Sequence, residues 1–149
     1  MTGGGSADED DAIARMLRMT TIAVVGLSSD PSQPSESVGR YLREAGYHVI
    51  PVSPYEQKVH GQRAYPDLAS VPEPVELVDV FRRSEAAPDV VRQAIAVGAQ
   101  GVWLQLGILS DEAERLAREA GLLFVQDKCI RTEHRMRGIP NRWPVRGGR

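Results

Sequence analysis

Cysteine and histidine are scarce in this sequence, and the shortage excludes several kinds of site. Cys129 is the single cysteine among 149 residues, so the chain cannot form an internal disulfide or a zinc site of paired cysteines. The three histidines, His48, His60 and His134, lie far apart, and we expect no metal site. A reduced protein located in the cytoplasm is the simplest expectation.

The sequence also lacks a long apolar run and an excess of charge of either sign. The most continuous apolar stretch, residues 22–27, is far shorter than the roughly 18 to 20 residues that a membrane-spanning helix needs. Eighteen basic residues against twenty acidic ones give a formal charge of -2, which provides no overall field to attract nucleic acid or an anionic membrane. We therefore expect neither partner, and an anion must be bound locally.

The composition is that of a single globular domain, with 42 % hydrophobic and 26 % charged residues. Residues 1–11 are rich in glycine and acidic side chains, and we expect a disordered N-terminal segment there. Residues 12–138 form the predicted domain. Residues 139–149 are a basic tail with Arg142, Arg146 and Arg149, which we interpret as a solvated terminus rather than a nucleic-acid site.

Apolar residues follow strand and helix periods in alternation. Helical spacing of Ile13, Met16 and Leu17 predicts a short helix before the first strand. The pattern then predicts strands at 22–25, 48–52, 77–80, 101–104 and 122–126, and helices around 38–45, at 88–97 and at 110–120. Each of these three helices ends at a glycine suited to a left-handed cap, namely Gly46, Gly98 and Gly121.

Buried strands that alternate with helices predict an α/β fold of three layers, a doubly wound and mostly parallel sheet of five strands. The segment 53–74 holds four prolines and one short helical candidate, 67–71. We therefore expect the second crossover to be irregular.

In such a sheet, ligands bind beside the carboxyl ends of the strands. Four segments lie there: 26–35, 51–55, 80–83 and 105–108. The first resembles a phosphate loop, because a glycine and several hydroxyl residues precede a helix, although it is neither GxGxxG nor Walker A. Ser35 or Ser37 can also be a plain helix N-cap, which is the more common role for such a serine.

A nicotinamide dinucleotide site is disfavoured. The second strand ends in Val52-Ser53-Pro54, without the acidic residue that would bind the ribose hydroxyls of NAD. Arg82 and Arg83 follow the third strand and can bind a phosphate, or pair with a nearby acid such as Glu85. Two alternatives to the binding of another nucleotide stay open on this fold, namely an NAD(P)-linked oxidoreductase and a protein-interaction module.

Catalytic residues are not evident. Cys129, Glu133 and His134 are close in sequence, and a thiol beside an imidazole is found in nucleophilic catalysis. A terminal helix over 130–137 favours a plainer interpretation, with a buried thiol and a histidine on the helix surface. No second carboxylate pair or serine elbow occurs.

Six sequence blocks in a fixed order resemble those of the small stand-alone CoA-binding proteins. They are Ala23-Val24-Val25-Gly26-Leu27-Ser28 with Pro31 and Pro34-Ser35, Arg40-Tyr41-Leu42 with Ala45-Gly46-Tyr47, Pro51-Val52-Ser53-Pro54, Val78-Asp79-Val80-Phe81-Arg82, Trp103-Leu104-Gln105-Leu106-Gly107-Ile108, and Asp127-Lys128-Cys129 with Glu133-His134. The resemblance covers residues 13–137. It implies the Rossmann-like CoA-binding domain that is also found in the alpha subunit of succinyl-CoA synthetase.

The resemblance implies a binding protein for coenzyme A or an acyl-CoA, with no defined reaction. By position, it places the diphosphate at the first loop, the adenosine at the turn after the second strand, and the rest of the ligand along the next two turns. The candidate residues are Gly26, Leu27, Ser28, Ser29, Pro34, Ser35, Val52, Ser53, Pro54, Phe81, Arg82, Arg83, Gln105 and Gly107.

Two residues depart from the expected pattern. Ser53 stands where the family usually has an asparagine, and Asp30 places a negative charge in the phosphate loop, from which it must turn away if a diphosphate binds. The expected partner is a small-molecule nucleotide. A homo-oligomer stays open as well, since an exposed apolar edge can pair two copies, although no pairing motif identifies an interface.

Overall fold

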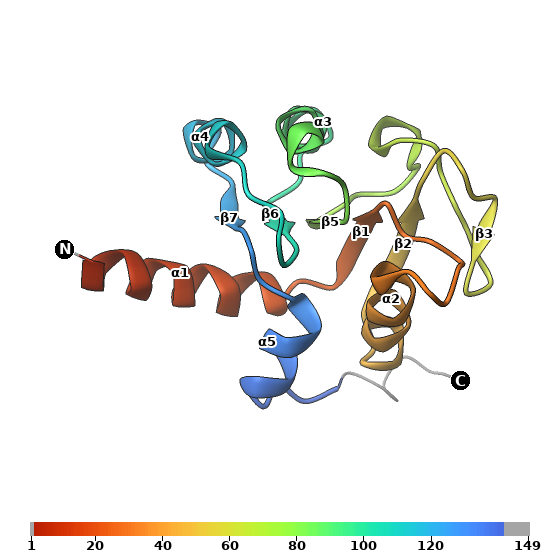
Figure 1. Ribbon diagram of the computed structural model, residues 1–149, viewed down its shortest axis with the longest axis horizontal. Helices are drawn as coiled ribbons and strands as arrows, with labels where there is room; N and C mark the ends of the chain where they lie inside the picture. Colours follow the sequence, from red (N-terminus) through yellow and green to blue (C-terminus); the bar gives the residue numbers. More distant parts are fainter. Residues whose placement is uncertain (1, 142–149) are drawn as a thin grey trace.

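A parallel sheet of five strands forms the centre of the computed structural model, which describes residues 2–141 and, for side chains, residues 8–141 (Figure 1). The strands lie in the order β2-β1-β5-β6-β7. Their bounds are Thr21–Val25 for β1, His48–Val52 for β2, Leu77–Val80 for β5, Gly101–Leu104 for β6 and Leu123–Val125 for β7. The chain adds strands on one side of β1 and then on the other, so the order reverses between β1 and β5.

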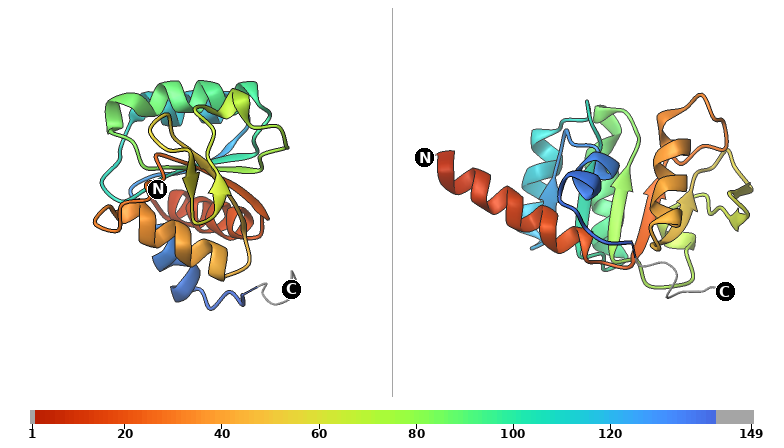
Figure 2. Two further views of the ribbon diagram at one scale, coloured as in Figure 1. Left: turned by 90° about the vertical axis from the view of Figure 1, so that its right-hand side faces the viewer. Right: turned by 90° about the horizontal axis from the view of Figure 1, so that it is seen from below.

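Helices cover both faces of the sheet, as Figure 2 shows. One face carries α1 (Thr2–Leu17), α2 (Pro34–Glu44) and α5 (Ile130–Met136), and the other carries α3 (Ala87–Ala96) and α4 (Asp111–Glu119). Within β1, Ile22 and Val24 pack on the first face, whereas Ala23 and Val25 pack on the second. Burial on both faces explains the continuous apolar strands, and the predicted three-layer fold is confirmed.

Glycine caps set three of the helix ends as predicted. Gly46, Gly98 and Gly121 have φ angles of +101°, +80° and +81°, in the left-handed region that residues with a Cβ rarely adopt. The predicted cap at the start of α2 was wrong. The N-cap is Gln33, because Pro34 already has the fixed φ of a first helical residue and begins the helix earlier than Ser35 or Ser37.

The second crossover is irregular, as expected, but it contains a hairpin that the sequence pattern did not reveal. Strands β3 (Lys58–Val59) and β4 (Gln62–Arg63) pair antiparallel, and the 3-10 turn η1 (Leu68–Ser70) follows, whereas a second 3-10 turn, η2 (Ser84–Ala86), comes after β5. Beyond the hairpin, Tyr65 runs alongside the outer edge of β2. Its N–H donates to the Pro51 carbonyl at 3.0 Å, and its own carbonyl accepts from Ser53 N–H at 2.8 Å.

Helix α1 begins at Thr2, well before Ile13, the first residue of the helical spacing that predicted it. The acidic residues that suggested disorder are helical, and two of them are paired: Asp10 lies 3.0 Å from Arg137, and Glu9 lies 3.9 Å from Lys128. The arginines predicted for the basic tail lie outside the described residues. Within residues 2–141, no helix has the length and apolar character needed to cross a membrane.

Candidate functional site

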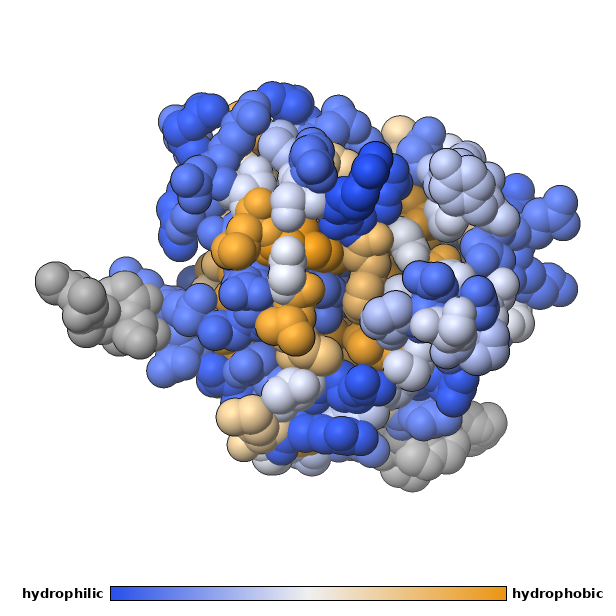
Figure 3. Space-filling view, viewed as in Figure 1, coloured by the Kyte–Doolittle hydropathy of each residue, from blue (hydrophilic) through white to orange (hydrophobic). Residues whose placement is uncertain are grey.

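A cleft of about 470 Å³ opens at the carboxyl edge of the sheet, where the strand order reverses. It is bounded by the loops that follow β1, β2 and β5. Its lining residues are Gly26, Leu27, Ser28, Asp30, Gln33, Ser53, Pro54, Tyr55, Glu56, Phe81, Arg82 and Arg83. Figure 3 shows this side of the molecule, with apolar side chains at the centre and polar ones around them.

Gly26 is the point at which the three loops meet. Its N–H donates to the carbonyl of Val52 at 2.8 Å, and its φ of +91° is in the left-handed region. A Cβ at this position would collide with the backbone carbonyl of Phe81. Glycine is therefore required here both by conformation and by the close approach of the β5 loop.

The loop after β1 is held in shape largely by its own side chains. The hydroxyl of Ser35, in the first turn of α2, accepts the N–H of Ser28 at 3.0 Å, and the Ser28 hydroxyl accepts the N–H of Asp30 at 3.0 Å. The Asp30 carboxylate accepts from the N–H and hydroxyl of Ser32, both at 2.9 Å. These bonds, the one from the Ser32 N–H first, lower the pKa of Asp30, so that its charge remains in the loop.

Glu56 is a cleft residue that the sequence interpretation missed. It comes from the segment between β2 and β3, and its carboxylate contacts Ser29 in the loop after β1. The only signal was an acidic residue directly after segment 51–55, which we had placed at this edge. The contact with Ser29 could not be predicted from the sequence, because the two residues are 27 positions apart.

Ser53, the residue at which the sequence departs from the expected pattern, is nearly buried in its own turn. Its hydroxyl accepts the N–H of Tyr55 at 3.1 Å. The side chain therefore stabilises the turn that carries Pro54 and Tyr55 along the cleft.

Arg82 and Arg83 are exposed and line the cleft. The pairing with Glu85 that we had considered is not seen, and within residues 8–141 neither arginine takes part in an ion pair or a side-chain hydrogen bond. Two guanidinium groups that form no ion pair among the described residues thus line the same cleft as the loop that resembles a phosphate loop. Such groups bind phosphate oxygens well.

The structure brings eight of the fourteen predicted site residues together in the cleft, and it places four of the others next to it. Ser29 is exposed and bonds to Glu56, which lines the cleft, and Pro34 and Ser35 lie in the first turn of α2. Val52 lines a small adjoining hollow of about 110 Å³ together with Pro54 and Arg82.

Gln105 and Gly107, after β6, hold local structure. The Gln105 side chain is buried, donates to Asp79 and accepts the N–H of Ile130 at 3.3 Å. The Gly107 N–H donates to Asp127 at 2.7 Å. The apolar side chains exposed in this loop are instead Leu106 and Leu109, with 70 % and 53 % exposure.

The predicted surface position of His134 was wrong. Because α5 packs against α2, His134 is buried, with its Nδ1 atom 2.7 Å from the Tyr41 hydroxyl and its ring edge-on to Tyr41 and Tyr47. Cys129 is partly buried at the N-cap of α5. Neither residue lines the cleft, and among the described residues no group of three or more His, Cys, Asp and Glu could hold a metal.

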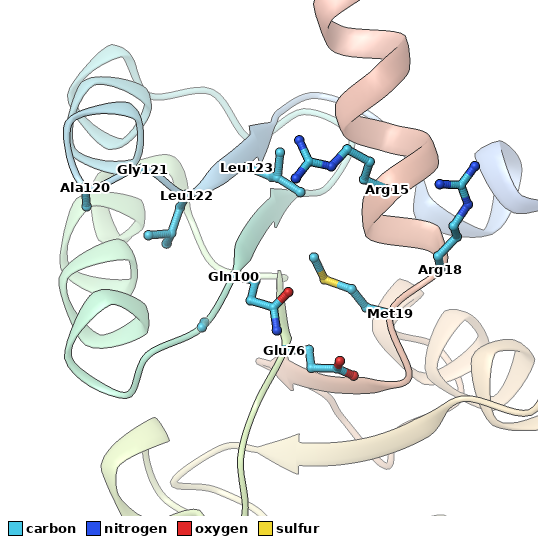
Figure 4. A pocket seen from close by; sticks show the side chains of 10 residues that line it. Arg15, Arg18, Met19, Glu76, Gln100, Ala120, Gly121, Leu122 and Leu123 are labelled. Atoms are coloured by element: carbon cyan, nitrogen blue, oxygen red, sulfur yellow. The ribbon is translucent and has the colours of Figure 1, made fainter.

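A larger hollow of about 640 Å³ lies at the opposite edge of the sheet (Figure 4). Its polar residues include Arg15, Arg18, Glu76 and Gln100. Glu76 accepts the N–H groups of residues 20 and 21, both at 2.8 Å, and so fixes the turn from α1 into β1. This edge carries the amino ends of the strands, so the general rule for parallel sheets places the ligand site in the smaller cleft.

Comparison with known proteins identifies the family of this chain. Residues 20–135 match the family described as CoA binding domain. The uncharacterized protein YneT of Bacillus subtilis is 37 % identical over 119 residues, which cover 80 % of this chain and 88 % of YneT. The alpha subunit of an ADP-forming acetate–CoA ligase II from Pyrococcus furiosus is 26 % identical over 73 % of this chain, but only 26 % of that subunit is covered.

Solved structures show the same fold. A hypothetical protein from Pyrococcus horikoshii OT3 has a TM-score of 0.82 and 37 % identity, with 86 % of this chain and 90 % of that one covered. The structure of cell-free ID.343 from Thermus thermophilus has a TM-score of 0.80 and 40 % identity, with 86 % and 97 % covered. The match over most of the chain confirms the resemblance inferred from the six sequence blocks, and the chain belongs to the CoA-binding domain family.

Proposed function

We propose that this protein binds coenzyme A, free or as an acyl thioester, in the cleft at the carboxyl edge of the sheet. The observation that carries the proposal is the pair of exposed arginines, Arg82 and Arg83, in the same cleft as the loop at Gly26 and outside every ion pair among the described residues. Coenzyme A carries a diphosphate and a ribose phosphate, and guanidinium groups bind such oxygens by charge-assisted hydrogen bonds. Membership of the CoA-binding domain family supports the same ligand.

In the proposed pose, the diphosphate lies between the loop that starts at Gly26 and the arginines. The adenosine lies along the turn at residues 52–54. The pantetheine arm extends toward the loop after β6, where Leu106 and Leu109 offer exposed apolar surface. The loop after β6 contacts the segment after β5 that carries Arg82 and Arg83, since the Leu109 N–H donates to the Ser84 hydroxyl at 3.0 Å.

Binding without catalysis is the role that the cleft chemistry favours. The titratable side chains among its lining residues are Asp30, Tyr55, Glu56, Arg82 and Arg83. These groups suit recognition of a charged ligand, and they do not include the paired nucleophile and base that covalent catalysis uses. The proposed role is therefore that of a carrier or sensor of CoA.

Calorimetric titration of the purified chain with coenzyme A tests the proposal, with NADP as the comparison dinucleotide. We expect saturable binding of one CoA per chain, and a loss of about 1 to 3 kcal/mol in the Arg82→Ala variant because a charge-assisted contact is removed. Arg92→Ala is the matched control, since Arg92 pairs with Glu112 on the outer helices at 2.8 Å.

Two results would contradict the proposal. The first is no heat of binding with CoA, and the second is equal weakening by the Arg82 and Arg92 variants. Saturable binding of NADP in place of CoA would instead support the alternative of an NAD(P)-linked enzyme, which turnover of a reduced cofactor would then establish.

A further inference from the structure

Two donors of Ser29 converge on a single carboxylate oxygen. The Ser29 N–H and hydroxyl both donate to Oε2 of Glu56, at 2.9 and 3.1 Å. A backbone N–H and a hydroxyl aimed at one anionic oxygen form the arrangement with which protein loops bind phosphate. The loop after β1 thus already binds an anion, and that anion is part of the protein.

The contact with Glu56 differs from the other bonds of this loop. The N–H groups of Ser28, Asp30 and Ser32 are accepted by side chains of the loop itself or of the first turn of α2. Only the Ser29 N–H, among these four, is accepted by a residue from another segment, 27 positions along the chain. The loop keeps its internal bonds without Glu56, so Glu56 occupies a donor pair that the loop presents.

The side chain of Glu56 also controls the charge of the cleft. Glu56 and Asp30 line it together with Arg82 and Arg83, so the formal charges of its side chains cancel. Glu56 lines the cleft, and its carboxylate occupies both Ser29 donors. A diphosphate that approaches Ser29 meets a like charge, which disfavours binding until the carboxylate moves.

Glu56 is placed where it can move. It is only partly buried, and the neighbouring Tyr55 is 89 % exposed. Among the described residues, the Glu56 carboxylate bonds to Ser29 alone. Rotation of this side chain toward solvent breaks those two bonds and leaves the apolar core unchanged.

We propose that Glu56 is an internal anion that competes with the diphosphate of the ligand for the Ser29 donor pair. Binding of the ligand displaces the Glu56 carboxylate, and the exchange lowers the affinity for every anion that binds there. Glu56 thereby selects ligands whose other contacts, such as those to Arg82 and Arg83, compensate for the displacement. This inference rests on the proposed function and identifies the residue that sets the affinity of the site.

The test is calorimetric titration of the wild-type chain and of Glu56→Gln and Glu56→Ala with coenzyme A and with ADP, which shares the diphosphate. We expect both variants to bind both ligands roughly three- to tenfold more tightly, because no charged competitor has to leave the donors. Glu73→Gln is the control. It removes the same charge from an exposed residue that pairs with His48, 2.8 Å away, and it should leave the affinity unchanged.

A second measurement does not depend on CoA as the ligand. Titration with inorganic pyrophosphate, followed at the Ser29 amide by ¹⁵N NMR, should saturate at a lower concentration in Glu56→Ala than in the wild type, and the amide spectrum also shows whether the variant is folded. Unchanged or weaker binding in the Glu56 variants, or an equal gain in Glu73→Gln, would overturn the inference and leave the proposed function intact. Absence of CoA binding in every chain would overturn the proposed function, while the pyrophosphate titration would still decide the role of Glu56.

Discussion

Among the described residues, Asp79 has a carboxyl group whose chemistry is strongly altered by the fold. The residue is fully buried in β5, one of its oxygens accepts from Gln105, and the other has no hydrogen-bond partner among the described residues. Burial raises its pKa from 3.8 to about 7, although the bond from Gln105 acts in the opposite direction. The folded chain therefore retains a proton that the unfolded chain releases.

The sign of the resulting pH dependence follows from this difference in proton binding. Ionisation of Asp79 begins in the unfolded state near pH 3.8 and in the folded state near pH 7, so its contribution to the free energy of unfolding falls as the pH rises through this range and levels off above it. In Asp79→Asn the contribution is absent. We expect the melting temperature of this variant, relative to the wild type, to increase from pH 5 to pH 8 in calorimetric scans. A constant difference would contradict the raised pKa.

The hairpin of β3 and β4 is joined to α2 by a side-chain contact in its turn. Glu36 of α2 is buried and accepts from Arg40 and from His60 Nε2, the latter at 2.8 Å. The bonds from Arg40 and His60, in that order, lower the pKa of Glu36. This contact is therefore fully present above the ordinary pKa of a carboxyl group, and it weakens as the pH falls toward the lowered value.

Removal of that charge should loosen the hairpin and leave the central sheet unchanged. In Glu36→Gln we expect faster amide hydrogen exchange at residues 58–63, with protection of β1 and β5 retained, because the hairpin packs on the sheet only at its margin. Mass spectrometry of exchanged peptides measures this directly. Glu119→Gln on α4 serves as the surface control, and equal exchange in all three chains would show that Glu36 does not hold the hairpin.

Elements of the central layer could be predicted from sequence, and the smaller ones could not. Burial on both faces gives each sheet strand an apolar run, and left-handed glycines mark where three helices end. Strands of two residues, such as β3, are too short to show the alternation of apolar and polar residues that identifies a strand. For α5 the helix itself was predictable, but helical spacing does not tell which partner a polar residue such as His134 will meet in the folded chain.

At the scale of the whole molecule, the candidate site is built from segments that only the folded chain brings together. The meeting of the loops after β1, β2 and β5 was predictable, because parallel strands end at one edge of the sheet. The contact of Glu56 with Ser29 was not, since it depends on the path of an irregular crossover. Position within the sheet is therefore encoded locally in the sequence, whereas the contacts between loops follow from the assembled fold.

A site made in this way exists only in the folded chain, so a ligand of this site binds the native state and not the unfolded state. Coenzyme A at a hundred times its dissociation constant should then raise the free energy of unfolding by about 2.7 kcal/mol. Thermal shift measurements over a series of CoA concentrations test this, and Arg82→Ala should show a smaller shift at each concentration. A melting temperature that does not respond to CoA would contradict binding at this cleft.

The two outer strands of the sheet determine how this protein can associate. Strand β2 has Pro51, which lacks an N–H, and the adjoining Tyr65 already bonds to this edge, while β7 is only three residues long. Neither edge presents a long row of unpaired backbone groups to another sheet, so extension of the sheet from one molecule to the next is disfavoured. The same crossover that carries Glu56 to the cleft thus also disfavours pairing of the β2 edge with another sheet.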